Sequence, residues 1–275
     1  MKKRKGIILA GGYGTRLYPL TKIISKQLLP VYDKPMIFYP LSTLMQANIQ
    51  EILIITTPND KELFIKLLGN GSDFGINISY KTQKKPEGIA QSLIIAEKFL
   101  DNSPSALILG DNIFHGNEIS EALLKKDSAD NGATIFLYRV DNPNRYGVAE
   151  ISENKVIDID EKPKKPKSPY AVTGLYLYDN KAPQIAKTLL PSERGEFEIT
   201  DLNKIYMHNN ELNYVKLNIN STWLDSGTHE SLFEASSFVF KMQQEEKCLL
   251  GCPEEIAFEK GWINKKKINN FIEKI

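Results

Sequence analysis

The first half of the chain alternates short apolar runs with segments of helical periodicity, and this alternation restricts the fold more than any other feature. Strands connected by helices form parallel sheets, because a crossover of this kind brings the next strand back in the same direction. We therefore expect an α/β fold with a mixed, mainly parallel central sheet and helices on both faces. The predicted strands are residues 6–10, 51–57, 76–83, 105–112 and 133–140, and the predicted helices are residues 40–47, 59–68 and 88–100.

The second half is less regular and predicts an antiparallel addition to the sheet. Residues 148–151 and 155–162 flank a polar turn and read as a hairpin, and a lysine- and proline-rich loop follows at 162–167. Further strands are expected at 170–179, 212–218 and 222–227, and helices at 181–190, 198–208 and 228–247, with short helices after that. Because no linker, repeat or low-complexity tract interrupts the pattern, we expect a single domain over 1–275.

Composition limits the classes of partner. With 275 residues, 41% of them hydrophobic, the chain can bury a large core, and its net charge of +1 gives no bulk attraction to nucleic acid or membranes. The apolar stretch after the basic start is too short for a signal peptide or a membrane span, so we expect a cytoplasmic protein. Cys248 and Cys252 are expected to be reduced thiols, and three histidines make a zinc site improbable.

A glycine-rich turn, GGYGTR at residues 11–16, directly follows the first strand. Glycines let backbone N–H groups approach phosphate oxygens closely. Arg16 adds a planar fork for phosphate, and Lys26 adds a compact positive charge. The spacing matches neither the dinucleotide-binding nor the P-loop motif. The alternative is a tight turn with a solvated arginine, but the later SKQLLP segment makes phosphate binding the more specific interpretation.

Two carboxylates are expected at strand ends, where ligands of open parallel sheets bind. Asp111 lies in the polar C-terminal end of the strand predicted at 105–112, and Asp225 lies in the WLDSG segment. Together they suit Mg²⁺, which keeps several waters and bridges phosphates. Taken singly, each has an alternative: Asp111 reads equally as a helix cap, and for Asp225 the cap is the stronger interpretation.

Three further polar segments fit a sugar phosphate and a base. Glu161 and Lys162 end a strand, so the acid is placed to accept from hydroxyls and the lysine to pair with a phosphate; the alternative is an exposed charged turn. Arg194 precedes Glu198, Thr200 and Asp201. This segment is explained equally well as a ligand-binding segment or as an acid-rich helix N-terminus, which the helix dipole favours. Gln83, at another strand end, is placed to read a base edge with its amide.

Covalent catalysis is not indicated, because the sequence offers no pairing of a nucleophile with histidine. A reaction that joins two phosphates does not need one. The second pKa of a phosphomonoester is near 6, so its dianion is already a nucleophile at neutral pH. Positioning and charge neutralisation are then sufficient.

The ordered sequence blocks resemble the sugar-nucleotide pyrophosphorylase family over essentially the whole chain. The blocks are GIILAGGYGTRLYPLT, SKQLLPVYDKPMIFYPLSTLM, Gln83 with PEGIAQ, LILGDNIFHG, RYGVAE, DEKP, YAVTGLYLYD, RGEFEITDLN, WLDSGTHESLFEAS and CPEEIAF. The resemblance implies a nucleotidyltransferase-type fold in three parts: a nucleotide-binding half at 1–140, a sugar-binding part at 141–227 and a helical part at 228–275.

The resemblance also implies a role for each site residue. The dTTP nucleotide would be bound by Leu9, Gly11, Gly12, Gly14, Thr15, Arg16, Gln83 and Gly88, the last two reading thymine. Glucose 1-phosphate would be bound by Tyr146, Gly147, Glu161, Lys162, Val172 and Arg194. The catalytic residues would be Arg16, Lys26, Lys162, Asp111 and Asp225, with Asp111 and Asp225 holding Mg²⁺.

The implied reaction joins glucose 1-phosphate to the α-phosphorus of dTTP, giving dTDP-glucose and pyrophosphate. This is the first step toward dTDP-deoxysugars such as dTDP-L-rhamnose, and the implied assembly is a homotetramer. A UTP-preferring enzyme of the same fold stays open as an alternative. A non-catalytic sugar-nucleotide sensor is disfavoured, because the cationic and acidic groups named above are all present.

One departure concerns the regulatory nucleotide site that the family carries between subunits. The resemblance leads us to expect a glycine–arginine pair at 218–220 and a basic residue at 259. This chain has Asn218, Ile219 and Asn220, and then Glu259. Because an anion site that loses two cations is weakened, we expect feedback by dTDP-sugars to be weak or to use a differently built site.

Overall fold

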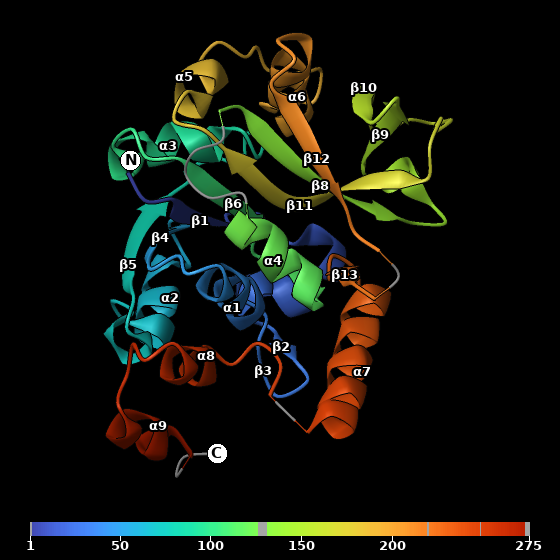
Figure 1. Ribbon diagram of the computed structural model, residues 1–275. Helices are drawn as coiled ribbons and strands as arrows, with labels where there is room; N and C mark the ends of the chain where they lie inside the picture. The colour runs from blue at the N-terminus through green and yellow to red at the C-terminus, as the bar shows by residue number, and fades with distance from the viewer. Residues whose placement is uncertain (1, 126–130, 219, 248, 273–275) are drawn as a thin grey trace. The chain divides into compact units, whose positions relative to one another are not determined.

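The computed structural model describes residues 2–125, 131–218, 220–247 and 249–272, and its elements are labelled in Figure 1. The chain forms two compact units. Unit 1 comprises Met1–Ile7, Lys85–Ile108 and His115–Trp223, and unit 2 comprises Ile8–Lys84, Leu109–Phe114 and Leu224–Ile275. Strands β1 (Lys5–Ala10) and β6 (Ser105–Leu109) contribute residues to both units.

Unit 2 contains the parallel part of the sheet, with strand order β1-β4-β5. Strands β4 (Glu51–Thr56) and β5 (Asn77–Thr82) pair in parallel, and Glu51 lies opposite Asn77. Five of the six residues of β4 are buried, as expected of an apolar strand covered on both faces. The helices of unit 2 are α1 (Phe38–Gln46), α2 (Lys61–Leu68), α7 (His229–Glu246), α8 (Pro253–Glu259) and α9 (Lys265–Ile272).

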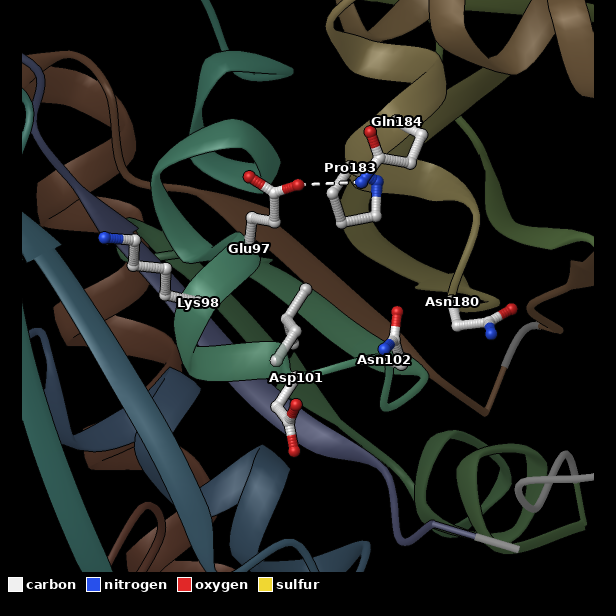
Figure 2. A pocket seen from close by; sticks show the side chains of 8 residues that line it. Glu97, Lys98, Asp101, Asn102, Asn180, Pro183 and Gln184 are labelled. Carbon is white, nitrogen blue, oxygen red and sulfur yellow. Dashed lines mark hydrogen bonds between the residues drawn. The ribbon is translucent and has the colours of Figure 1, made fainter.

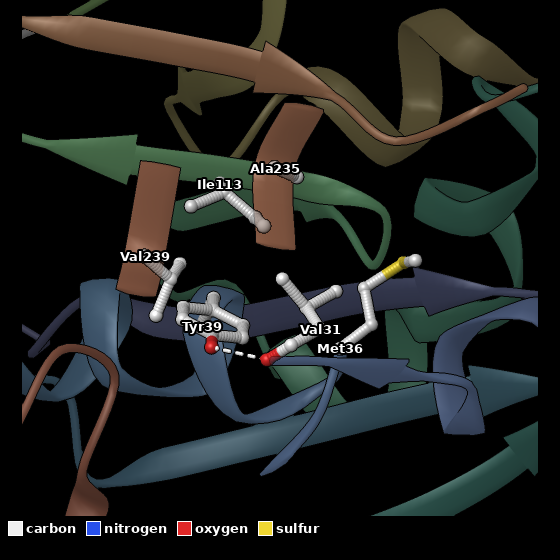
Figure 3. Packing of buried hydrophobic residues seen from close by; sticks show 6 residues of the cluster. All are labelled: Val31, Met36, Tyr39, Ile113, Ala235 and Val239. Atoms are coloured by element: carbon white, nitrogen blue, oxygen red, sulfur yellow. Dashed lines mark hydrogen bonds between the residues drawn. The ribbon is translucent and has the colours of Figure 1, made fainter. Parts of the chain in front are cut away.

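A small apolar cluster in unit 2 packs a hairpin against helices α1 and α7 (Figure 3). The hairpin is formed by β2 (Pro30–Val31) and β3 (Lys34–Pro35). The Tyr39 hydroxyl donates to the Val31 carbonyl at 2.8 Å. Backbone N–H groups of Met36 and Ile37 donate to the carbonyls of Leu29 and Gln27, both at 2.9 Å. The hairpin therefore holds in place the 3₁₀ turn η3 (Lys26–Leu28), which carries Lys26.

Unit 1 contains a largely antiparallel part of the sheet, with strand order β10-β9-β11-β6. The predicted hairpin is confirmed as β9 (Gly147–Ser152) and β10 (Lys155–Glu161), with an irregularity between Val156 and Asp158. Strand β11 (Tyr170–Tyr178) also pairs antiparallel with β8 (Ala133–Arg139), and β12 (Leu212–Lys216) pairs with β8 in parallel. The sheet is therefore mixed, which confirms the α/β fold.

The helices of unit 1 pack along this sheet and against one another. They are α3 (Gln91–Leu100), α4 (Asn117–Lys125), α5 (Ala182–Ala186) and α6 (Ile199–His208). Helix α6 packs against β10 and β12, and α3 packs against α5. The first turn of α6 therefore lies beside the end of β10, where Glu161 is placed. No helix among the described residues combines the length and apolar character needed to cross a membrane.

Several predicted boundaries were wrong. The strand predicted at 105–112 ends at Leu109, and a separate strand, β7 (Asn112–His115), follows and pairs with β13 (Thr222–Asp225). The helix predicted from residue 88 begins at Gln91, because Gly88 has φ +100°, outside the helical region. The helix predicted at 181–190 is short, spanning Ala182–Ala186. Helix α4 and the hairpin β2–β3 were not predicted.

Short 3₁₀ turns make up much of the segment between β1 and α1. They are η1 (Thr15–Leu17), η2 (Leu20–Lys22) and η3, and two more lie at Ser72–Phe74 and Pro143–Arg145. Cys252 is a buried free thiol, and burial raises its pKa to about 12, as expected for a reduced, unreactive cysteine. Cys248 lies outside the described residues.

Candidate active site

The glycine-rich loop of unit 2 has a backbone conformation that depends on glycine. Gly14 has φ +61°, and a Cβ atom there would lie 2.9 Å from Thr21 Cγ2 and 3.1 Å from Lys26 Cβ. The Thr21 hydroxyl donates to the Gly14 carbonyl at 2.8 Å, and Gly14 precedes the turn η1, which begins at Thr15. The loop is therefore fixed close to the segment that carries Lys26.

The start of the loop is open. A Cβ atom added at Gly12 would have no neighbour within 4 Å, whereas one at Gly11 would collide with the side-chain oxygen of Gln83. Gln83 is buried, and its backbone N–H donates to the Thr56 carbonyl at 2.8 Å. The structure thus places Gln83 against the glycine loop. Leu9 precedes the loop, and its carbonyl accepts from the Gly110 N–H at 2.9 Å.

Lys26 and Asp111 form an ion pair in unit 2. Their side chains are only 10% and 14% exposed, and the Asn112 amide donates to the other Asp111 oxygen at 3.1 Å. Burial acts to raise the pKa of Asp111, but attraction to Lys26 and hydrogen bonds from Lys26 and Asn112 outweigh it, so this pKa is lowered. Asp111 is therefore a carboxylate at neutral pH, and Lys26 compensates its charge.

Asp225 and Arg16 lie close to this pair within unit 2. The backbone N–H of Ser226 donates to the Asp111 carbonyl at 3.1 Å, which brings the segments of the two aspartates together. The position that a Cβ on Gly227 would occupy is 2.9 Å from Arg16 Nη2 and 3.2 Å from Asp225 Oδ1. The predicted phosphate-binding arginine and the second carboxylate are therefore neighbours.

The ligands that this cluster offers fit Mg²⁺ better than they fit a metal ion whose ligands all come from protein side chains. No group of three metal-ligating His, Cys, Asp or Glu residues occurs in the part of the chain that the structure describes. Two carboxylates, which Asp111 and Asp225 supply, are what Mg²⁺ commonly takes from a protein when phosphates complete its coordination.

Three residues predicted to bind glucose, Gly147, Glu161 and Val172, lie close together in unit 1. A Cβ atom on Gly147 would lie 3.3 Å from Thr200 Oγ1, 3.5 Å from Glu161 Oε2 and 3.7 Å from Val172 Cβ. The Thr200 hydroxyl donates to Glu161 Oε2 at 2.6 Å. Thr200 was noted in the sequence only as part of a helix start, because its link to Glu161 depends on the packing of α6 against β10.

The two predicted phosphate-binding cations flank the same glutamate. Glu161 Oε1 lies 3.3 Å from Lys162 Nζ and 3.5 Å from Arg194 Nη2. The Lys162 N–H donates to the Tyr146 carbonyl at 3.0 Å, and the Tyr146 ring packs edge-on against Trp223, with ring centroids 5.0 Å apart. Tyr146 thus joins this group through the backbone of Lys162. Trp223 was not predicted as a site residue, although it begins the WLDSG block.

Gly88 is the one predicted nucleotide-binding residue in unit 1. Its backbone lies against Phe197: a Cβ atom on Gly88 would be 2.6 Å from the Phe197 nitrogen. The Phe197 N–H donates to the Glu87 carbonyl at 2.7 Å, and the Ala90 N–H donates to the Phe197 carbonyl at 3.2 Å. The segment around Gly88 is therefore held by the chain that connects Arg194 to α6.

A polar surface cavity of roughly 340 Å³ lies elsewhere in unit 1 (Figure 2). It lies between α3 and α5, and across it the Gln184 amide donates to Glu97 Oε1 at 2.7 Å. None of its lining residues belongs to the predicted substrate-binding set. The candidate site residues therefore form two groups of polar side chains, one within each unit, and neither group lines this cavity.

Residues 5–242 match the family described as nucleotidyl transferase, so the chain belongs to the nucleotidyl transferase family. Two similar proteins indicate which kind of nucleotidyl transferase the chain resembles. The chain is 55% identical over 98% of its length to a glucose-1-phosphate thymidylyltransferase of Xanthomonas campestris, and it covers 91% of that protein. It is 54% identical over 96% of its length to the enzyme of the same name from Neisseria meningitidis, of which it covers 92%.

Solved structures agree on the fold. A Bacillus anthracis protein described as a glucose-1-phosphate thymidylyltransferase, in complex with sucrose, is 46% identical and superposes with a TM-score of 0.78 over 86% of this chain and 94% of its own. A UDP-glucose pyrophosphorylase complexed with UDP-glucose is 25% identical, with a TM-score of 0.75 over 87% of this chain and 99% of its own. The chain is accordingly a nucleotidyltransferase enzyme.

Proposed function

We propose that the chain transfers a thymidylyl group from dTTP to α-D-glucose 1-phosphate, giving dTDP-glucose and pyrophosphate. The observation that carries the proposal is the cluster in unit 2 where a glycine loop, Arg16, Lys26 and two aspartates gather. Such a cluster suits a polyphosphate with a divalent cation. The names of the relatives supply the nucleotide and the sugar, which the geometry alone does not identify.

The residues of unit 2 account for the nucleotide. Backbone N–H groups of the loop at 11–15 and the Arg16 guanidinium would hold the triphosphate, and Gln83 would read the base with its amide. Lys26 would neutralise charge that develops on the α-phosphate as the sugar phosphate attacks. Asp111, which pairs with Lys26 in this structure, would then need another cation to balance its negative charge.

Mg²⁺ fits that requirement, with Asp111 and Asp225 as its carboxylate ligands. When bound, it would neutralise the charge of the triphosphate and of the departing pyrophosphate. The chain's own contribution is to keep Asp111 ionised and in place, through the Asn112 amide and the backbone bond to Ser226.

The residues of unit 1 account for the sugar phosphate. Glu161, held by the Thr200 hydroxyl, would accept hydrogen bonds from glucose hydroxyls. The sugar would lie beside Gly147, where the absence of a Cβ atom leaves space. Lys162 and Arg194 would pair with the phosphate. An oxygen of that phosphate forms the new bond to the α-phosphorus as the bond to pyrophosphate breaks. No general base is needed, because the phosphate dianion is already the nucleophile.

Three attributes extend this proposal. We expect a homotetramer in the cytoplasm that supplies dTDP-glucose to dTDP-deoxysugar synthesis, with dTDP-L-rhamnose as the default product. Size-exclusion chromatography with light scattering tests the assembly. A monomer or dimer would contradict the tetramer without affecting the activity.

A pyrophosphate-release assay tests the activity itself. The purified chain is given each nucleoside triphosphate with Mg²⁺ and with glucose 1-phosphate or one of several other sugar 1-phosphates. With glucose 1-phosphate, dTTP should give the highest kcat/KM. A higher value with UTP would select the uridylyl alternative. Absence of product with every nucleotide and every sugar 1-phosphate would select a non-catalytic sensor.

A further inference from the structure

Arg194 is held by a closed turn just before helix α6. The Ser192 N–H donates to the Glu196 carbonyl at 2.9 Å, and the Gly195 N–H donates to the Ser192 carbonyl at 2.8 Å. These bonds fix the backbone on both sides of Arg194. The side chain itself stays 42% exposed, so the turn alone does not determine its direction.

The carboxylate contacts of Arg194 gather on one nitrogen. Nη2 donates to both oxygens of Glu198, at 2.8 and 2.9 Å, and it lies 3.4 Å from Glu196 and 3.5 Å from Glu161. A guanidinium carries five N–H donors. Within the described residues, the hydrogen bonds that Arg194 donates to carboxylates use Nη2 alone, so Nε and Nη1 keep donors for an anionic ligand.

Glu198 and Glu196 differ in how firmly they are held. The Glu198 side chain is 10% exposed, and it accepts a hydrogen bond from the Ser192 hydroxyl at 2.7 Å. Glu198 also directly precedes helix α6, which starts at Ile199. The Glu196 side chain is 38% exposed, and its 3.4 Å contact with Arg194 is an ion pair without a hydrogen bond. Glu198 is therefore a fixed anchor, whereas Glu196 is a solvated neighbour.

We propose that Glu198 is a positioning residue that presets Arg194 for the phosphate of the sugar substrate. Glu198 binds Nη2 and so restricts the Arg194 side chain to one rotamer. The donors on Nε and Nη1 are then already oriented when the ligand binds. Preorganisation of this kind lowers the ordering cost of binding. The inference rests on the proposed function, because it assigns the anion to the sugar 1-phosphate.

The test compares Glu198→Gln with the matched control Glu196→Gln. Both changes remove one negative charge beside Arg194, but only the first removes the fixed anchor. Glu198→Gln should raise the KM for glucose 1-phosphate about tenfold, on the scale of one immobilised side chain. Its KM for dTTP should stay within twofold of wild type. Glu196→Gln should leave both values within twofold.

A double-mutant comparison separates positioning from a direct contact. If Glu198 acts through Arg194, then Glu198→Gln should add nothing to the KM increase caused by Arg194→Ala. Ser192→Ala, which removes the hydroxyl bound to Glu198, should raise the same KM by a smaller factor. This second variant keeps the test available if Glu198→Gln lowers the yield of folded protein.

Several results would overturn the inference. They are an unchanged KM for glucose 1-phosphate in Glu198→Gln, an equal effect in Glu196→Gln, or a further loss in the Arg194→Ala background. Failure of the proposed function looks different, because the wild-type chain would then release no pyrophosphate from dTTP and glucose 1-phosphate. If wild type is active and the variants behave alike, only the role of Glu198 is wrong.

Discussion

Replacing Lys26 by methionine should destabilise the ligand-free protein, because it leaves a buried carboxylate without its partner. The side chains of Lys26 and Asp111 are 10% and 14% exposed, so solvent screens the pair little. Breaking a buried ion pair from one side costs about 3–5 kcal/mol. Asn112 still donates to Asp111 in the variant. We therefore expect the lower end, about 3 kcal/mol, or a fall in melting temperature of roughly 6–12 °C.

The loss should depend on pH in a defined direction. In the wild-type protein the pKa of Asp111 is lowered, so its contribution to stability is present above the unfolded pKa and is lost as pH falls through the folded value. Without Lys26, burial is less opposed and the pKa of Asp111 rises. The carboxyl group of the variant then takes up a proton at a higher pH, so the deficit should shrink toward acid.

Thermal melts in EDTA at pH 8 and pH 5 measure both effects. The double variant Lys26→Met with Asp111→Asn should recover part of the loss, since no buried charge remains. Lys187→Met serves as a control, because its ion pair with Glu97 is exposed and should contribute little. A Lys26→Met protein that melts like wild type at pH 8, or a double variant no more stable than the single one, would refute the reasoning.

Three further predictions concern activity. Lys26→Ala should lower kcat about 10²–10³-fold while changing dTTP affinity much less, because its charge acts mainly as the transition state forms; an unchanged kcat in steady-state assays would exclude Lys26 from the reaction. Asp111→Asn should abolish Mg²⁺-dependent turnover, measured by a magnesium titration, and a variant that loses only thermal stability would limit Asp111 to a structural role. The helix-cap alternative is wrong, because strand β7 and not a helix follows Asp111. dTDP-sugars should inhibit weakly, because acidic groups at the expected regulatory site repel an anion: Glu118 accepts hydrogen bonds from Asn218 in unit 1, and residue 259 is acidic. Strong inhibition that is non-competitive with dTTP would contradict this.

The sequence was informative where a local pattern determines a local structure. Apolar runs bounded by turn residues identified the strands. Phosphate binding by the GGYGTR turn stays a prediction, and the structure adds that Gly14 has a left-handed backbone. The carboxylate Asp111 was expected at a strand end, and it lies in the two-residue turn between β6 and β7. Hairpin β9–β10 was found because two strand-like segments flank a polar turn at 152–154.

Contacts between distant segments could not be predicted. The ion pair of Lys26 with Asp111 joins residues 85 positions apart, and the bond of Thr200 to Glu161 requires α6 to pack on β10. Glu198 read as one acid among several at a helix start, because only the folded turn shows it holding Arg194. Helix α4 was missed although its segment is amphipathic: Ile119 and Leu123 are four positions apart and both are buried.

The division of the chain into two compact units has a consequence for how its substrate specificity can change. Apart from Gly88, the residues assigned to the nucleotide and the cation belong to unit 2, while those assigned to the sugar phosphate belong to unit 1. Substitutions that adapt one unit to a new sugar need not disturb the packing around Lys26 and Asp111. A change of sugar 1-phosphate therefore requires substitutions in one unit only, and the residues assigned to the nucleotide and the cation in the other unit can stay as they are.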